Sequence, residues 1–378
     1  MKTALVLSGG GARGAYQVGV LKALAQLLPR TGVNPFQIVC GTSSGAINAA
    51  KVASEADDFH QAIKGLEAIW SNLSSDQVHQ VGYGDIVKSA AKILMSFFHS
   101  GIAKGQSLSL FNNQPLFNLL TRSIDIARLD KMISAQHIHA LSISALGYSS
   151  GQNISFFQGH DSLQPWRRSR RIGAKTCLEH KHLMASSALP AIFPAVRLNR
   201  EYFGDGALRQ SAPMSAALHL GADKLLVIGV SGSHDTLEER MVTQHSPTIA
   251  QVLGNLLNSA FIDSLEEDVH MLERFNRVAQ HLSNEQQAEL QIRPVELLVI
   301  KPSIKFDQMA ADFTHELPRS MRFLLSIIGA NKKGGGASLA SYILFEKQYC
   351  QALINSGYQD AMAQAEDIRQ FVGVCGLP

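Results

Sequence analysis

Apolar residues along the first 54 positions follow strand-like and helix-like patterns in turn. A short apolar run at 5–7 is followed by a glycine loop, and apolar residues then recur at helical spacing over 15–27. A second apolar run at 36–40 leads through a Gly-Ser turn into a helix of small residues at 46–53. Two buried strands joined through a helix favour a parallel pair in an α/β sheet.

The rest of the chain supplies further strands and then a largely helical region. Three later apolar runs with turn or helix signals on either side are predicted strands: 140–146, 224–230 and 295–300. Helical spacing dominates three other stretches: 85–135, 248–290 and 317–378. We therefore expect a mostly parallel sheet flanked by helices over residues 1–231. Residues 232–378 are expected to form a mostly helical extension packed on the same domain, with one strand at 295–300.

Composition narrows the class of protein. Of 378 residues, 46% are hydrophobic and 17% charged, which excludes extended disorder, and a net charge of +3 is too small to indicate a nucleic-acid binder. The longest apolar runs fall short of the roughly 18 residues of a membrane span. No metal or cofactor is expected. The chain is predicted to be cytoplasmic, free or peripheral to a membrane, because its cysteines show neither metal-site spacing nor a disulfide framework, which favours a reducing compartment. The cysteines are Cys40, Cys177, Cys350 and Cys375.

The glycine loop supports two interpretations. Gly9, Gly11 and Gly14 form G-x-G-x-x-G between a predicted strand and a predicted helix, the pattern of a dinucleotide-binding oxidoreductase. The acidic residue that such a site needs about 20 positions later is absent, since the first acid is Glu55. The alternative is an anion held by the loop amides, including a transient oxyanion, and Arg13 would favour an anionic substrate if it lined the site.

A candidate nucleophile lies at the next strand-to-helix junction. The run 41–45 is G-x-S-x-G, with Ser43 flanked by Gly41 and Gly45. Glycines are needed there because a nucleophile elbow is too tight for neighbouring side chains, and the following helix directs its positive end at the serine. The alternative is a helix N-cap. The elbow follows only the second strand, which argues against the ordinary α/β-hydrolase fold.

Asp205 is the best-placed candidate for a general base. It lies in a predicted glycine-rich turn at 202–207, where burial would raise its pKa and turn amides would lower it. An ordinary Asp-Gly turn is the alternative. A histidine base is also conceivable, with His182, His219 and His234 as candidates, although helix or loop positions favour structural roles for all three.

Together these motifs resemble the patatin-like phospholipase family, as does a fourth block at 185–194. The resemblance implies a three-layer α/β fold and a patatin-like acyl hydrolase domain over 1–231. It also implies a catalytic dyad with Ser43 as nucleophile and Asp205 as base. The oxyanion would be held by the amides of three residues: Gly10, Gly11 and Ala12. Further motif positions are Gly9, Arg13, Gly14, Gly41, Gly45 and Gly206.

The implied function is hydrolysis of lipid acyl esters, of the phospholipase A or lysophospholipase kind, through an acyl-enzyme. The expected partner is a phospholipid or other acyl ester, without nucleic acid, and the oligomeric state is left open. Three alternatives remain: a general carboxylesterase or thioesterase, the dinucleotide-binding oxidoreductase, and a catalytically silent lipid-binding protein.

Two stretches are candidates for membrane contact. Residues 86–104 mix apolar side chains with lysines, as an interfacial helix does, although the pattern favours a buried core helix. Residues 166–171 place four arginines beside Trp166, which suits phospholipid headgroups or a solvated loop.

Overall fold

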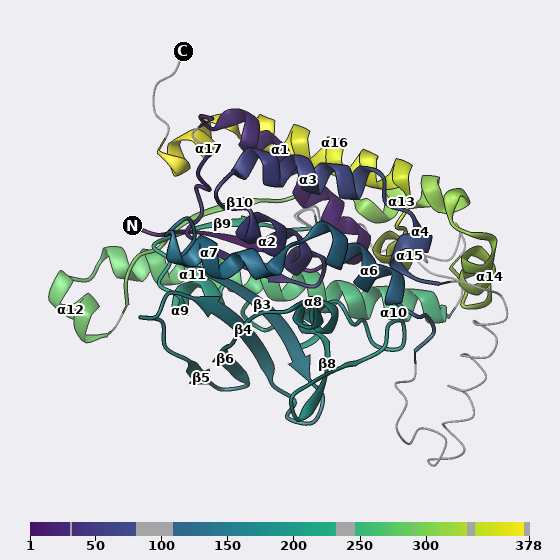
Figure 1. The fold of residues 1–378 in the computed structure, drawn as a ribbon, viewed down its shortest axis with the longest axis horizontal. Coiled ribbons are helices and arrows are strands. Elements are labelled where there is room, and N and C mark those ends of the chain that lie inside the picture. Colours follow the sequence, from purple (N-terminus) through teal and green to yellow (C-terminus); the bar gives the residue numbers. More distant parts are fainter. Residues whose placement is uncertain (31, 81–108, 232–245, 291, 331–336, 374–378) are drawn as a thin grey trace.

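A computed structural model describes residues 1–30, 32–80, 109–231, 246–290, 292–330 and 337–373 of the chain (Figure 1). Within these ranges the chain builds one sheet of ten strands. Its main path runs β10-β9-β1-β2-β3-β4-β6-β5, and β8 pairs with both β3 and β7. The strands from β10 to β3 are parallel, whereas β4 and β8 run antiparallel to β3.

The strands are β1 (Thr3–Leu7), β2 (Ile38–Thr42), β3 (Ala140–Gly147), β4 (Asn153–Gly159), β5 (Trp166–Arg168), β6 (Arg171–Lys175), β7 (Val196–Leu198), β8 (Glu201–Asp205), β9 (Lys224–Ile228) and β10 (Glu296–Ile300). The α-helices are α1 (Gly14–Leu27), α2 (Ser44–Ser54), α3 (Phe59–Ser71), α4 (Ser75–Val78), α6 (Gln114–Ser123), α7 (Leu129–Ser134), α8 (His180–Ser186), α9 (Ser215–His219), α10 (Ile249–Asn258), α11 (Ser264–Gln280), α12 (Asn284–Glu289), α13 (Phe306–Phe313), α14 (Arg319–Ile327), α15 (Ala337–Ile343), α16 (Lys347–Ala363) and α17 (Ala365–Val372).

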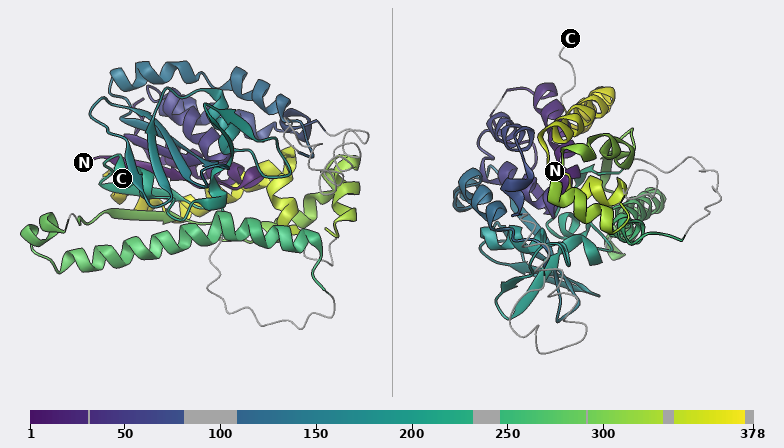
Figure 2. Two further views of the ribbon diagram at one scale, coloured as in Figure 1. Left: turned by 90° about the horizontal axis from the view of Figure 1, so that it is seen from below. Right: turned by 90° about the vertical axis from the view of Figure 1, so that its right-hand side faces the viewer.

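Alternation along the central strands produces three layers. Leu5 and Leu7 of β1 face a core shared with α1, α2, α3 and α16, whereas Ala4 and Val6 face a core shared with α9 and α11. Both faces of β1 are therefore covered, as a parallel sheet requires. Figure 2 shows α10 and α11 as one long, nearly continuous helical rod across one side of the molecule, joined by a π-helical segment, Ser259–Asp263. The predicted class, a mixed α/β fold with a helix-flanked sheet, is confirmed.

Most predicted elements are present, with shifts at their ends. The runs at 5–7, 140–146, 224–230 and 295–300 are β1, β3, β9 and β10, whereas the run at 36–40 forms a strand two residues later, at Ile38–Thr42. Strands β4 to β8 were not predicted, because most are short or partly exposed and lack a clear apolar pattern. The candidate membrane stretch at 86–104 lies outside the described residues.

The C-terminal helices pack directly on the first half of the chain. Helix α16 crosses α1 at two glycines: a Cβ on Gly19 would lie 1.9 Å from the Ile354 carbonyl oxygen, and one on Gly357 would lie 2.1 Å from the Tyr16 carbonyl oxygen. The Tyr16 hydroxyl also donates a 3.0 Å hydrogen bond to Asp360. Only glycine permits this backbone approach. The division of the chain at residue 231 stays a prediction.

Replacing Gly357 by alanine tests the importance of this crossing. The added methyl group has to separate two helix backbones, so Gly357→Ala should lower the free energy of unfolding by about 1–3 kcal/mol, despite the better helix propensity of alanine. Urea titration followed by circular dichroism measures the change. Gly229→Ala is the control, since its Cβ would meet no atom closer than 3.5 Å. Equal urea midpoints for both variants and the wild type would contradict the account.

Candidate active site

The register of strand β3 brings two distant residues together. Strand β2 ends with Thr42 opposite Ser144, and the antiparallel β8 ends with Asp205 opposite the next residue, Ala145. The residue after β2 and the last residue of β8 therefore meet beside the same strand. The Ser43 hydroxyl donates a 2.6 Å hydrogen bond to Oδ2 of Asp205, across 162 positions of sequence.

Ser43 has the backbone conformation of a nucleophile elbow. Its φ of 55° and ψ of −126° lie in a region that residues other than glycine rarely adopt. A Cβ on Gly41 would lie 2.3 Å from the Gly45 carbonyl oxygen, and one on Gly45 would lie 2.3 Å from the Leu7 carbonyl oxygen. Both glycines therefore allow α2 to start directly above the sheet, where its positive N-terminal end lies beside the serine.

A second serine holds the elbow in place. The Ser43 amide donates a 2.9 Å hydrogen bond to the Ser186 hydroxyl, which in turn donates one of 2.6 Å to the Ser144 carbonyl oxygen. Ser186 ends α8 and belongs to the block 185–194, which showed a family resemblance but had no predicted role. The sequence around Ser186 does not indicate this role, because the hydroxyl of a buried helical serine usually hydrogen-bonds within its own helix.

The Asp205 carboxyl group is fully buried and accepts two hydrogen bonds. One comes from the Ser43 hydroxyl and the other, of 3.0 Å, from the Ala207 amide. Burial raises the pKa of Asp205 to about 7, although both hydrogen bonds act to lower it. Asp205 is the last residue of β8 rather than part of a turn, so the predicted turn position was wrong. A 3₁₀ helix, Gly206–Arg209, follows it.

The glycine loop runs beside Ser43, and three of its amides are available to an anion. A Cβ on Gly9 would lie 3.1 Å from the Ser43 Cβ, so the loop and the elbow are in close contact. Within the described ranges, the amides of Gly10, Gly11 and Ala12 donate no recorded hydrogen bond. Buried N–H groups without acceptors are uncommon and suit a transient anion. Gly11 has a φ of 56°, in the left-handed region that glycine adopts readily, so this residue type suits the tight loop.

Arg13 anchors this loop to the C-terminal helices. Its side chain is buried and donates hydrogen bonds of 2.9 and 2.7 Å to the Ser341 hydroxyl and one of 3.1 Å to the Tyr342 hydroxyl. The guanidinium carbon also lies 3.9 Å from the centroid of the Tyr342 ring. Arg13 does not line the pocket beside Ser43, so the structure assigns it a structural role instead of contact with an anionic substrate.

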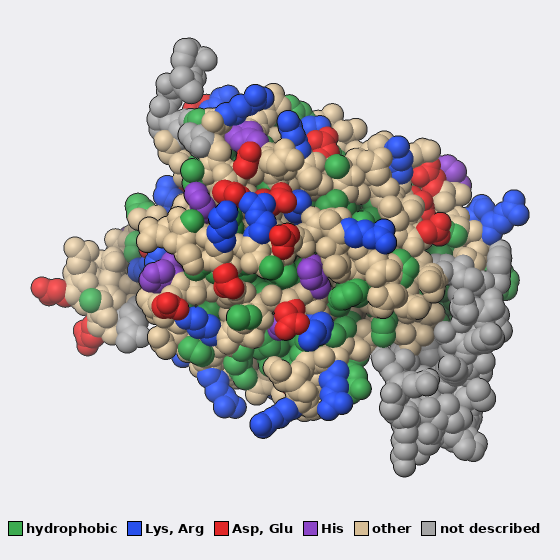
Figure 3. All heavy atoms as spheres, viewed as in Figure 1, with side chains coloured by type: hydrophobic (Ala, Val, Ile, Leu, Met, Phe, Trp, Pro, Cys, Tyr) green, Lys and Arg blue, Asp and Glu red, His purple; other side chains and the backbone are tan. Residues whose placement is uncertain are grey.

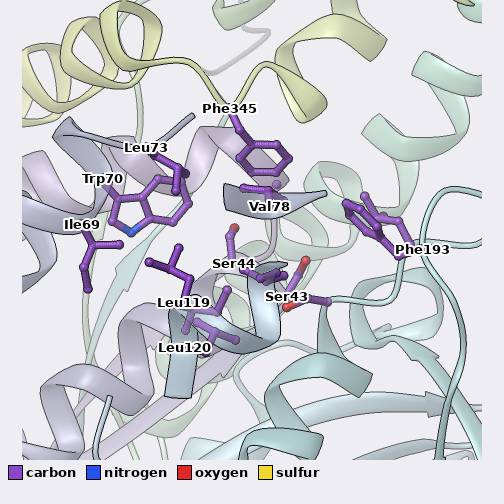
Figure 4. Close-up of a pocket in the computed structure, with 15 residues that line it drawn as sticks. Ser43, Ser44, Ile69, Trp70, Leu73, Val78, Leu119, Leu120, Phe193 and Phe345 are labelled. Atoms are coloured by element: carbon purple, nitrogen blue, oxygen red, sulfur yellow. The ribbon is translucent and has the colours of Figure 1, made fainter. Parts of the chain in front are cut away.

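An apolar pocket opens on Ser43 (Figure 4). Its empty space, counted together with the part that is open to solvent, is about 550 Å³, and Ser43 and Ser44 are among the residues that line it. The Ser44 hydroxyl has no hydrogen-bond partner within the described part of the chain. The walls are aliphatic and aromatic: Ile47, Ile69, Trp70, Leu73, Val78, Leu116, Leu119, Leu120, Leu189, Phe193 and Phe345. Such walls suit a hydrocarbon chain.

The candidate histidines lie elsewhere or outside the described residues. The ring of His182 bonds to the backbone of Glu179 and packs against Phe156. The ring of His219 bonds to the Ser215 carbonyl oxygen. Across the described ranges, no histidine hydrogen-bonds to the serine-aspartate pair. His234 lies outside those ranges.

The arginine-rich stretch at 166–171 forms the β5-β6 hairpin. Trp166 stacks between Phe157 and His219, with ring centroids 5.0 and 4.9 Å away, so the indole belongs to the packing of this edge. Arg167, Arg168 and Arg170 are exposed. Only these arginines, and not the indole, remain available for headgroups.

Comparison with known proteins defines the class. Residues 5–218, more than half of the chain, match the family described as patatin-like phospholipase. The chain therefore belongs to the patatin-like phospholipase family, which argues against a dinucleotide-binding oxidoreductase. It is 28% identical over 217 residues to a cGAMP-activated phospholipase of Pseudomonas aeruginosa, covering 57% of this chain and 55% of that protein. It is 25% identical over 279 residues to human calcium-independent phospholipase A2-gamma, covering 71% of this chain and 32% of that protein.

The chain thus spans about half the length of the first relative and a third of the second. Among solved structures, VipD from Legionella pneumophila aligns with 97% of this chain and 67% of its own, at 14% identity and a TM-score of 0.40. Human GIVD cytosolic phospholipase A2 aligns with 99% of this chain and 58% of its own, at 12% identity and a TM-score of 0.43. Over the described residues, no helix combines the length and apolar character that crossing a membrane needs.

The raised pKa of Asp205 predicts how stability depends on pH. The carboxyl group titrates near 4 in the unfolded chain and at about 7 in the folded one, so its protonated form stabilises the folded state at low pH. This contribution is complete below pH 4 and is lost as the pH rises through 7. Relative to wild type, Asp205→Asn should therefore gain stability, on the order of a few kcal/mol, between pH 5 and pH 8. Urea unfolding of both proteins at each pH measures this, and parallel pH profiles would refute it.

Proposed function

We propose that this protein is a lipid acyl hydrolase of the phospholipase A or lysophospholipase type, acting through Ser43 and Asp205. The observation that carries the proposal is the 2.6 Å hydrogen bond between the serine hydroxyl and a fully buried carboxyl group. A base with a pKa of about 7 is half ionised at neutral pH and can still accept a proton, which is the compromise that general-base catalysis favours.

The acylation step follows from this geometry. Ionised Asp205 removes the proton from Ser43 as Oγ attacks the ester carbonyl carbon, and the carbonyl π electrons move onto oxygen. The amides of Gly10, Gly11 and Ala12 are proposed to hold the resulting oxyanion. When the tetrahedral intermediate collapses, the C–O bond to the leaving alcohol breaks and Asp205 returns its proton to that alcohol. The acyl group remains on Ser43.

Deacylation repeats these events with water as the nucleophile. Asp205 takes a proton from water as its oxygen attacks the acyl carbonyl carbon, and the same amides hold the second oxyanion. Collapse breaks the bond to Oγ, Asp205 returns the proton to Ser43, and the fatty acid leaves. No histidine is required, because one carboxyl group serves both half-reactions directly.

The pocket supports a long-chain acyl group. Its walls are apolar, and Arg13, two residues after the pocket residue Gly11, is held by hydrogen bonds to Ser341 and Tyr342 of α15. A general carboxylesterase or thioesterase remains the alternative within the same chemistry. Comparing a long-chain lysophospholipid with a short-chain soluble ester separates them, because only the lipid enzyme gains catalytic efficiency from a chain that fills the pocket.

Replacing the nucleophile tests the proposed function. Ser43→Ala should reduce hydrolysis of a long-chain lysophospholipid at least roughly a thousandfold, because the covalent route is lost. Fatty-acid release by the purified protein measures this. Ser44→Ala is the matched control: it removes an adjacent pocket hydroxyl that has no recorded partner, and we expect it to keep most of the activity. Wild-type turnover in Ser43→Ala would show that another residue is the nucleophile.

A further inference from the structure

Helix α10 exposes an apolar stripe to solvent. Ile249, Val252, Leu253 and Leu256 are 63%, 46%, 41% and 61% exposed. Their spacing of three, one and three residues places them on one face of the helix. The sequence carries no charged residue from 246 to 262. Aliphatic side chains arranged in this way mark an interaction surface more often than ordinary solvated surface.

The stripe continues onto α14. The Ala250 amide donates a 3.0 Å hydrogen bond to the Ile328 carbonyl oxygen, so the start of α10 lies beside the end of α14. There Phe323 and Ile327 are 50% and 64% exposed. We call these six side chains the α10-α14 face: Ile249, Val252, Leu253, Leu256, Phe323 and Ile327.

Two arginines extend this face at the start of α14. Arg319 and Arg322 are exposed. Arg319 lies four residues before Phe323 and eight before Ile327, so these three share one face of the helix, and Arg322 lies on the neighbouring face, three residues after Arg319. Within the described ranges, neither arginine is paired with a carboxylate. Elsewhere, for example over α3 and α7, charges of both signs are interspersed (Figure 3). The α10-α14 face thus combines aliphatic surface with unpaired positive charge.

The α10-α14 face is linked to the candidate active site through the glycine loop. Helices α10 and α14 lie toward the same end of the molecule as α4 and α6, which wall the pocket (Figure 1), while α10 and α6 lie on opposite sides of the molecule in Figure 2. Phe261 lies five residues after Leu256. A Cβ on Gly9 would lie 2.5 Å from the Phe261 ring, so this ring packs against the glycine loop. Gly9 in turn adjoins Ser43. The face is therefore backed by the segment that supports the catalytic loop.

We propose that the α10-α14 face docks on a phospholipid surface, with its six apolar side chains among the acyl chains and Arg319 and Arg322 at the phosphates. This inference rests on the proposed lipid substrate. A lipid surface presents hydrocarbon directly beneath phosphate, which matches an apolar stripe that ends in unpaired arginines. Docking there brings the lipid layer to the end of the molecule where α4 and α6 wall the pocket.

Sedimentation with ether-linked vesicles tests this docking independently of hydrolysis. The vesicles contain ether phosphatidylcholine with one third ether phosphatidylglycerol, which have no ester bond for the enzyme to cleave. The full-length variant Ile249→Ser/Leu253→Ser/Leu256→Ser should bind them at least roughly tenfold more weakly than wild type. Arg319→Ala/Arg322→Ala should weaken binding to these anionic vesicles but not to neutral ones.

A matched variant controls for general loss of apolar surface. Met271→Ser/Phe275→Ser/Val278→Ser removes three side chains from α11 that are 49%, 49% and 52% exposed. It should bind vesicles like wild type. Both triple variants should hydrolyse a soluble short-chain ester within about twofold of wild type, because neither touches the serine-aspartate pair.

Several results would overturn the docking proposal. These are equal loss of binding in the two triple variants, undiminished binding in the α10 variant, or complete loss in Arg167→Ala/Arg168→Ala/Arg170→Ala alone. A dimer of wild type that only the α10 variant disrupts, with vesicle binding intact, would make the face a self-association surface. Vesicle binding through α10 without hydrolysis of any phospholipid would instead refute the proposed function and leave the docking proposal standing.

Discussion

The position at which two strands end beside β3 governs the candidate active site. Because Ser43 follows β2 and Asp205 ends β8, a shift of register by one residue would turn one of the two side chains to the other face of the sheet. The arrangement carries two unfavourable features, a buried carboxyl group and a serine at positive φ. The sheet, Ser186 and the packing of Gly41 and Gly45 hold both in place.

The C-terminal helices complete the site that the first half of the chain begins. The family match ends at residue 218, yet Ser341 and Tyr342 bind Arg13 of the glycine loop, and Phe345 walls the pocket. A Cβ on Gly11 would lie 2.2 Å from the Tyr342 carbonyl oxygen, so the loop is shaped around α15. The shape of the proposed oxyanion site therefore depends on residues more than 300 positions away.

Local backbone constraints made part of the candidate active site predictable from the sequence. Gly41, Gly45 and Gly11 occupy positions where a side chain would collide with backbone, and such positions leave a glycine pattern that can be read directly. Ser43 could be selected because its neighbours reveal the turn. The role of Ser186 and the pocket walls could not be predicted, because they depend on contacts between helices and strands far apart in sequence. Strand β8 was missed for a different reason: its five residues alternate too briefly between apolar and polar to indicate a strand.

The central claim is that buried Asp205 activates Ser43 directly. Fluorophosphonate labelling followed by mass spectrometry tests this, because the probe reacts only with an activated nucleophile. The account predicts a single adduct on Ser43, formed faster as the pH rises through about 7 and lost in Asp205→Asn. An adduct on a different residue, or labelling of Ser43 that is unchanged in Asp205→Asn, would contradict it.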